Sequence, residues 1–290
     1  MSQIVSVGRW MPPVKHQQFG SCVGHTVCTA AECLHAVTYG TFGMEIDPYW
    51  VYWYLRVKQN FFGEGWGADT GGYAADGFDV AMNGVPRDSL WNTPTHAGEE
   101  PPESLNADAP NQDYVLGHHP FYASDPGGFM AGIWTALGNK QPVAIAMAWY
   151  NRWFDHEPIL PDTTGPLVGY HELCVYAGIP AGVLHPERLA IARNSWGAYT
   201  DVTELRRVLP EAMPGDIAIP ERYFLNGTVN ECRAATAEAI VVPPSEHCDQ
   251  EVHSAQQVDA DKVLRVRSRY KPNWPGSKAL LEAENAIRNQ

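Results

Sequence analysis

The chain has 290 residues, of which 44% are hydrophobic and 18% are charged, so it can bury a full core as a one- or two-lobed globular protein. Its formal net charge of −13 at pH 7 argues against general nucleic-acid binding and is compatible with attracting basic peptides. No stretch approaches about 18 consecutive apolar residues, so the sequence predicts no membrane span.

The first predicted helix begins at Cys22, directly after the flexible, cap-compatible pair Gly20-Ser21, and Gly40 is its natural C-terminal stop. Spacings of three and four residues give it one apolar stripe, formed by Val23, Val27, Ala30, Ala31 and Leu34. Cys22 falls in the first turn, where unpaired backbone N–H groups and the helix dipole favour an anion and lower a thiol pKa. Cys28 and Cys33 lie deeper in the helix, without that help. An isolated helix cysteine is more often a buried apolar residue, so position alone does not settle its role.

A second helix is predicted to begin at Pro48, with Asp47 as its N-cap. Its aromatic run, YWVYWYLRVK, is expected to pack between two lobes. The glycine-rich stretch 63–77 lacks the Lys-Ser/Thr step of a phosphate-binding loop. Residues 94–128 are expected to form a long loop that joins the lobes, with the pair His118-His119 facing solvent rather than binding a metal.

A thiolate nucleophile needs a base and an orienting group, which usually lie far away in the sequence. A strand is predicted to open at or just after His171, because apolar residues alternate with others from 172 to 177. A second apolar segment, residues 189–192, runs into Arg193-Asn194-Ser195-Trp196-Gly197. If the two strands are neighbours, the Asn194 amide oxygen can hold the His171 imidazole, and Trp196 can cover that hydrogen bond. An isolated Asn-Ser-Trp-Gly is otherwise an ordinary turn.

Together these segments resemble the papain-like cysteine peptidases over most of residues 10–235. The Gly-Ser-Cys entry to a helix, a later Gly-x-His strand and the Asn-Ser-Trp-Gly turn occur in that family's order. The resemblance implies an α+β, two-lobed papain-like fold. Its substrate cleft would lie between a helical lobe (roughly 14–125) and an antiparallel β-barrel-like lobe (roughly 126–242). Residues 1–242 would then form the peptidase domain, and residues 243–290 a C-terminal extension.

The resemblance assigns Cys22 as the nucleophile, His171 as its base and Asn194 as the residue that orients His171. Gln17 and the Cys22 backbone N–H would hold the developing oxyanion. The family's substrate-binding positions correspond here to Gly71, Gly72, Tyr73, Ala146, Glu172 and Trp196. Ala146 belongs to a strand opened by Gln141-Pro142-Val143, and residues 216–224 resemble the family's closing strand. The resemblance implies no cofactor and no metal.

The chain departs from the family pattern around this site. His16 stands six residues before the nucleophile, where the family usually has Gln. We infer a one-residue deletion after Gln17 and assign the oxyanion role to Gln17 rather than Gln18. Tyr170 precedes the base, where many relatives carry Asp or Asn. Glu172 is expected near the pocket that selects the substrate's second residue, which would favour a basic side chain there.

Cysteine usage indicates a reducing compartment. Many secreted relatives pair a cysteine three residues before the nucleophile with one just before the glycine pair, and Phe19 and Asp69 occupy those positions. Of the six cysteines, only Cys232 and Cys248 offer a reasonable bridge. The first residues do not form a signal peptide, so a cytoplasmic protein is expected, or a virion-associated one if it is phage-encoded. Ten residues precede Met11-Pro12-Pro13, so the sequence predicts a propeptide-free form similar to short bacterial and phage members.

Two regions exceed the family core. Residues 198–215 are predicted to form a charged, helical insert. In the extension, Leu264, Val266 and Tyr270 share one face of a strand-like run, and residues 277–289 form a short amphipathic helix. We expect this extension to dock on the core or to mediate self-association or assembly contacts, without supplying catalytic groups.

These inferences favour a cysteine endopeptidase that acts on a peptide or protein substrate through a Cys22 thioester. Two alternatives stay open. One is a papain-like binding or structural module in a larger assembly, such as a virion, with little turnover. The altered Gln spacing and the extension favour that alternative, and the complete triad argues against it. The other is acyl transfer or amide hydrolysis on a non-protein substrate, such as peptidoglycan peptides, because such enzymes share the triad.

Overall fold

The structure is a computed structural model that describes residues 3–43, 45–59, 69–109, 117–121, 128–154 and 157–237. Its α-helices are α1 (Cys22–Tyr39), α2 (Pro48–Gln59), α3 (Ala74–Ala81), α4 (Gly128–Gly138), α5 (Thr203–Arg206) and α6 (Arg222–Leu225). Its strands are β1 (Val5–Ser6), β2 (Gly117–Pro120), β3 (Val143–Tyr150), β4 (Leu167–Ile179), β5 (Leu189–Arg193), β6 (Asp216–Pro220) and β7 (Val229–Thr236). None of the described helices is long and apolar enough to cross a membrane.

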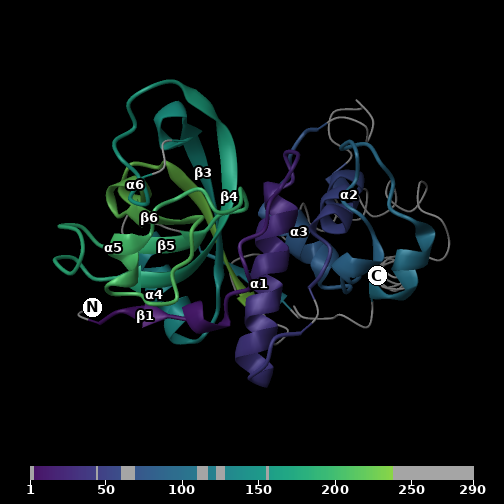
Figure 1. Cartoon of the computed structure of the whole chain (residues 1–290), viewed down its shortest axis with the longest axis horizontal. Coiled ribbons are helices and arrows are strands. Elements are labelled where there is room, and N and C mark those ends of the chain that lie inside the picture. The colour runs from purple at the N-terminus through teal and green to yellow at the C-terminus, as the bar shows by residue number, and fades with distance from the viewer. Residues whose placement is uncertain are drawn as a thin grey trace, which may run out of the picture.

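The strands form one antiparallel sheet in the order β2-β7-β3-β4-β5-β6, and β1 pairs separately with β4. Figure 1 shows the long helix α1 standing between this sheet on one side and helices α2 and α3 on the other. Both α1 and α4 contact β4. The buried side chains of helices and sheet belong to one continuous hydrophobic core, so α1 is packed on both of its sides.

Both helices predicted near the N-terminus are confirmed. α1 begins at Cys22 and ends at Tyr39, and the predicted stop Gly40 is its C-cap, with a left-handed backbone (φ 74°) and an N–H that donates to the Ala36 carbonyl at 2.9 Å. Asp47 Oδ1 caps α2 by accepting two backbone N–H groups of the first turn, at 2.8 and 3.0 Å. The aromatic run of α2 packs chiefly against α1 and α3. The expectation that this run lies between two lobes was therefore wrong.

Strand β4 differs from the predicted strand in its start and in its burial. It begins at Leu167, ahead of His171, and every residue from His171 to Ile179 is buried. Successive side chains of a strand point to opposite faces, so both faces of β4 are covered. The alternation of apolar and other residues from 172 to 177 therefore does not correspond to a solvent-exposed face, because α1 and α4 both pack against this strand.

Two other sequence predictions need correction. The segment 94–128 is more than a connecting loop, since it contains a 3-10 helix, Glu103–Ala107, and strand β2, which pairs with β7. In the insert 198–215, the α-helical part is limited to the single turn of α5. The predicted extension, residues 243–290, lies outside the described residues.

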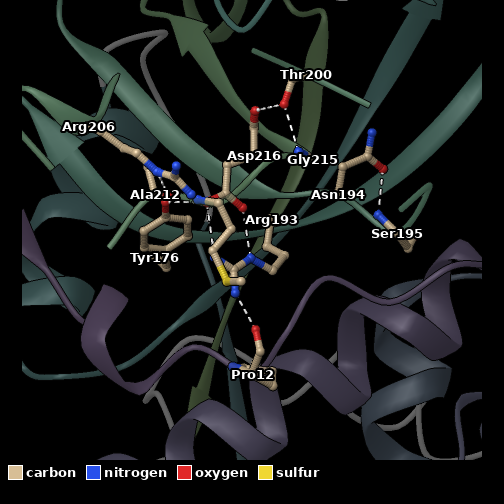
Figure 2. Close-up of polar contacts among 11 residues, drawn as sticks. Pro12, Tyr176, Arg193, Asn194, Ser195, Thr200, Arg206, Ala212, Gly215 and Asp216 are labelled. Atoms are coloured by element: carbon tan, nitrogen blue, oxygen red, sulfur yellow. Dashed lines mark hydrogen bonds and ion pairs between the residues drawn. The ribbon is translucent and has the colours of Figure 1, made fainter. Parts of the chain in front are cut away.

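Strands β5 and β6 are joined by a buried ion pair (Figure 2). Arg193 and Asp216 are partners in the strand register, and Arg193 Nε and Nη2 donate to the carboxylate at 2.7 and 2.9 Å. The same carboxylate accepts the Tyr176 hydroxyl at 2.7 Å and the Met213 N–H at 2.8 Å. Arg193 also donates to the Pro12 carbonyl. Both charges are thus paired and hydrogen-bonded, which is the condition under which a protein interior tolerates them.

Breaking this pair should be costly. Asp216→Asn leaves the Arg193 guanidinium buried without its carboxylate, so we expect the free energy of unfolding to fall by about 3–5 kcal/mol in urea denaturation. Glu204→Gln, which breaks the exposed pair between Glu204 and Arg207, is the matched control and should cost no more than about 1 kcal/mol. Equal effects of the two substitutions would contradict the importance assigned to the buried pair.

Candidate active site

A cleft of about 800 Å³ lies where the N-terminus of α1 meets strands β3, β4 and β7. Cys22 of α1 and His171 of β4 both line it. The predicted oxyanion residue Gln17 lines it too, as do the predicted substrate-binding residues Gly71, Gly72, Tyr73, Ala146, Glu172 and Trp196. Asn194 is the one predicted site residue outside this lining, and it binds His171. The fold therefore gathers residues from distant parts of the sequence around one cavity.

Asn194 directly follows β5 and binds the His171 ring. The ring Nε2 lies 2.7 Å from Asn194 Oδ1, and Asn194 Nδ2 donates to the Tyr199 hydroxyl at 2.8 Å. An amide oxygen can only accept, so His171 Nε2 carries the ring proton and Nδ1 has a lone pair. Trp196 stacks on His171 with ring centroids 4.3 Å apart, in the covering position that the sequence predicts.

Cys22 lies in the first turn of α1, but its environment differs from the expected one. The side chain is 9% exposed, and burial raises the pKa of the thiol to about 12, with a further rise from the neighbouring Glu172 carboxyl. Backbone N–H groups of Glu172, Val23 and Cys22 itself act in the opposite direction. The prediction of a lowered thiol pKa is therefore wrong for the resting site, because burial outweighs these N–H groups.

Burial also disfavours the charged form of His171. It lowers the pKa of the imidazole to about 4, and the bond to Asn194 offsets only part of that change. The resting site therefore holds a neutral thiol and a neutral imidazole at neutral pH. A thiolate and an imidazolium formed together would stabilise each other.

The two adjacent glutamines of the N-terminal segment are placed differently. Gln17 lines the cleft, and Gln18 is not among the described residues that do. Gln17 Oε1 accepts the Ser195 hydroxyl, and its Nε2 donates to the Phe19 carbonyl at 2.9 Å. An amide nitrogen carries two N–H groups, so the bond to Phe19 leaves Gln17 with a second donor beside the cleft.

Asp69 was not predicted as a site residue, yet it ties the loops of the site together. Its carboxylate accepts the Gly20 N–H at 2.9 Å and the Tyr52 hydroxyl, and that hydroxyl accepts the Gly71 N–H at 3.2 Å. Gly71 has φ 70°, in the left-handed region that favours glycine. The sequence held a signal for this role, since Asp69 and Phe19 stand at the two positions to which the resemblance assigns the disulfide of many papain-like peptidases. Hydrogen bonds to Asp69 join the same two segments here.

His118 is not solvent-facing, contrary to expectation. Its Nε2 lies 3.0 Å from Asp79 Oδ1 on α3, and its Nδ1 lies 3.1 Å from the Arg233 guanidinium on β7. Its neighbour His119 is exposed, as the sequence suggests. Within the described ranges, no group of three or more His, Cys, Asp or Glu side chains could hold a metal ion. The five described cysteines are free, and Cys248 lies outside the described residues.

Comparisons with known proteins agree on the fold. No protein-family model and no curated sequence matches the chain, whereas 210 chains of solved structures do. Xylellain, a cysteine protease from Xylella fastidiosa, matches with a TM-score of 0.61 and 18% identity, over 82% of this chain and 86% of that one. The bromelain protease from Ananas comosus, solved with the E64 inhibitor, matches with a TM-score of 0.59 and 16% identity, over 82% of this chain and 100% of that one. The chain has the papain-like fold.

A third match, digestive procathepsin L 3 of Tenebrio molitor larval midgut, has a TM-score of 0.58 and 16% identity, over 80% of this chain and 69% of that one. The expected α+β, papain-like fold class is thereby confirmed. At identities of 16–18%, these similarities establish the papain-like fold only. The role of each residue has to be argued from the geometry of the site.

The buried histidines should make the protein less stable in mild acid. Burial lowers the pKa of His25 to about 3 and that of His171 to about 4, whereas an unfolded histidine titrates near about 6.5. Between these values the unfolded state binds more protons, so the free energy of unfolding falls as the pH drops below about 6.5. We expect each histidine to contribute a loss of roughly 2 kcal/mol between about pH 7.5 and about pH 4.5, measured by urea denaturation.

His25→Gln should reduce this pH-dependent loss by about the contribution of one histidine. Val27→Ala, on the same helix, removes apolar contacts but no titrating group, so it should lower stability equally at both pH values. The assigned shift would be refuted by a His25→Gln variant whose stability falls with pH as steeply as that of the wild type.

Proposed function

We propose that this chain is a cysteine endopeptidase with Cys22 as the nucleophile, His171 as the base and Asn194 as the orienting residue. The observation that carries the proposal is the 2.7 Å contact between His171 and Asn194, which leaves a lone pair on the ring Nδ1 in the cleft that Cys22 also lines. The papain-like fold supports it, because solved structures with this fold include cysteine proteases. Endopeptidase action is favoured because the sequence contains no identifiable insert that would block the cleft.

In this mechanism the Cys22 thiol proton moves to His171 Nδ1 as the sulfur attacks the carbonyl carbon of a peptide bond. The second amide N–H of Gln17 and the backbone N–H of Cys22 would stabilise the oxyanion. His171 then protonates the leaving amine as the thioester forms. The imidazole next takes a proton from water, whose oxygen attacks the thioester and releases the acid, and the proton returns to the sulfur.

A binding module with little turnover is the second candidate, and one observation favours it. Burial raises the pKa of the Cys22 thiol to about 12, so the nucleophile is not ionised in advance. In a peptidase, the proton transfer to His171 then has to be part of substrate binding or of the attack itself. In a module, the thiol would simply keep its proton.

A peptidyl epoxide of the E64 type and a fluorogenic peptide distinguish the two candidates. For a peptidase, the epoxide should modify one cysteine, mapped to Cys22 by mass spectrometry, and the wild type should hydrolyse the peptide. Cys22→Ala should abolish both, whereas Cys28→Ala, which removes a buried cysteine of the same helix, should keep both. A folded wild type that shows neither labelling nor turnover would support the binding module.

The two glutamines give a sharper test of the oxyanion site. Removal of one oxyanion donor commonly costs about 10²–10³ in kcat, so Gln17→Ala should show a loss of that order with a modest change in KM. Gln18→Ala is the matched control, because its side chain is not among the described residues that line the cleft. Steady-state kinetics would reverse the assignment if Gln18→Ala were the more damaging change.

A further inference from the structure

The side-chain amide of Asn194 is held at both of its ends. Its Oδ1 accepts the His171 ring N–H and the Ser195 backbone N–H, each at 2.7 Å. Its Nδ2 donates to the Tyr199 hydroxyl at 2.8 Å. Asn194 is only 2% exposed, so its polar atoms depend on partners within the protein.

The two ends of this amide have different kinds of partner. A backbone N–H can only donate, so the contact with Ser195 decides that Oδ1, and not Nδ2, faces His171. A hydroxyl can donate or accept, so Tyr199 does not make that choice. What Tyr199 adds is a restraint on the rotation of the amide plane, together with an acceptor for a buried N–H group.

The contact with Tyr199 also makes Asn194 a better acceptor. Hydrogen bonds that follow one another through a polar group polarise each other. Donation from Nδ2 to Tyr199 therefore makes Oδ1 more negative, and a more negative Oδ1 binds the His171 N–H more strongly. The gain is larger for an imidazolium than for a neutral ring, because hydrogen bonds from charged donors are roughly twice as strong.

The Tyr199 hydroxyl is supplied by the insert 198–215, which exceeds the family core. Thr200 closes this insert at its base, because its hydroxyl accepts the Gly215 N–H at 2.7 Å and donates to the Asp216 carbonyl at 2.9 Å. Farther along the insert, four apolar side chains are buried in the hydrophobic core: Val202, Leu205, Leu209 and Ala212. The insert is therefore anchored at both its base and its middle, which gives Tyr199 a fixed position.

The phenol ring of Tyr199 lies on the same side of the site as Trp196. The two ring centroids are 6.0 Å apart, and Trp196 in turn stacks on His171. Burial raises the pKa of Tyr199 to about 12, so the phenol keeps its proton at neutral pH. Tyr199 is not among the described residues that line the cleft, so it would act through Asn194 rather than touch a substrate.

We propose that Tyr199 is a positioning residue for the reaction, whose hydroxyl fixes and polarises the Asn194 amide and thereby holds the His171 ring. This inference rests on the proposed peptidase function, in which Asn194 orients His171. The insert then has a defined task, since it carries the hydroxyl that completes the row of contacts from His171 through Asn194 to Tyr199.

The first test is spectroscopic and needs no turnover. Full-length Tyr199→Phe protein loses the hydroxyl and keeps the ring beside Trp196. In protein labelled with ¹⁵N-histidine, the His171 Nε2 proton should give a low-field signal, because it is hydrogen-bonded to Asn194. We expect Tyr199→Phe to move this signal upfield and to speed its exchange with solvent by about 3- to 10-fold, the effect of one lost hydrogen bond.

The second test follows the charge on His171. The contact with Asn194 raises the pKa of the imidazole, so weakening that contact should lower this pKa further. The other titratable groups around the ring are Cys22 and His25 on α1 and the adjacent Glu172, and the substitution leaves all three in place. Because the imidazolium is then less stabilised, labelling of Cys22 by an E64-type epoxide at neutral pH should slow by about 3- to 10-fold.

Tyr54→Phe is the matched control. The Tyr54 hydroxyl also donates to an asparagine side chain, at 3.1 Å to Asn106 Oδ1, and neither residue is among the described ones that line the cleft. Both variants lose one bond between tyrosine and asparagine, so urea denaturation should show similar losses of stability. Only Tyr199→Phe should change the His171 signal and the labelling rate.

A His171 signal and a labelling rate that are the same in Tyr199→Phe as in the wild type would overturn the proposal. If Tyr199→Phe did not fold, 4-fluorophenylalanine at position 199 would replace it, because fluorine fills the space of the hydroxyl and is a much weaker acceptor. This second variant should show the same upfield shift and slower labelling, and wild-type behaviour would again overturn the proposal.

Failure of the positioning role and failure of the peptidase can be told apart. Turnover by the wild type and by Tyr199→Phe at equal rates, with an unchanged His171 signal, would refute the role of Tyr199 and leave the peptidase standing. A shifted His171 signal in Tyr199→Phe, with neither turnover nor epoxide labelling in the wild type, would refute the peptidase and leave Tyr199 as the residue that holds Asn194 in a binding module.

Discussion

The buried pair of Arg193 and Asp216 fixes the point at which the chain leaves the sheet, and the rest of the site depends on that point. Asn194 follows Arg193, Gly215 precedes Asp216, and the Asn194 N–H donates to the Gly215 carbonyl at 3.3 Å. Figure 2 also shows the Thr200 hydroxyl bonded to both Asp216 and Gly215: it donates to the Asp216 carbonyl at 2.9 Å and accepts the Gly215 N–H at 2.7 Å. The charges therefore do not take part in the proposed chemistry. They place the amide that holds His171.

Burial has two opposed effects in the cleft. It keeps water from the contact between His171 and Asn194, where Trp196 stacks on the imidazole, and a hydrogen bond in such surroundings is electrostatically stronger than one in water. The same burial disfavours every lone charge, so Cys22, His171 and Glu172 all shift toward their neutral forms. A site of this kind becomes charged only in pairs. In the proposed mechanism, proton transfer from the thiol to the imidazole makes such a pair.

Features that depend on a few neighbouring residues, such as helix starts and caps, were predicted correctly from the sequence. Features that depend on contacts between distant segments were not. The start of α1 at Cys22 and the cap of α2 follow from capping chemistry within a few residues. The prediction that His171 and Asn194 lie close together came from two apolar segments and the assumption that they form neighbouring strands. The thiol pKa was mispredicted because a helix start is a local feature, whereas the burial of Cys22 comes from β4 and its glutamate. Asp69 was missed, and His118 was wrongly expected to face solvent, for a similar reason, since their partners lie on other segments.

A short antiparallel contact joins the segment that leads into α1 to the turn that carries Trp196. The Gln17 N–H donates to the Ser195 carbonyl at 2.7 Å, the Gly197 N–H donates to the Lys15 carbonyl at 3.0 Å, and His16 bridges to Trp196. Opening the cleft by a hinge rotation at this place would break these bonds, so α1, which carries the proposed nucleophile, and the sheet, which carries the proposed base, should move as one body when a substrate binds. Substrate capture would then need no slow closure. Its observed rate would rise linearly with substrate concentration in stopped-flow experiments, without the plateau that a preceding conformational step imposes.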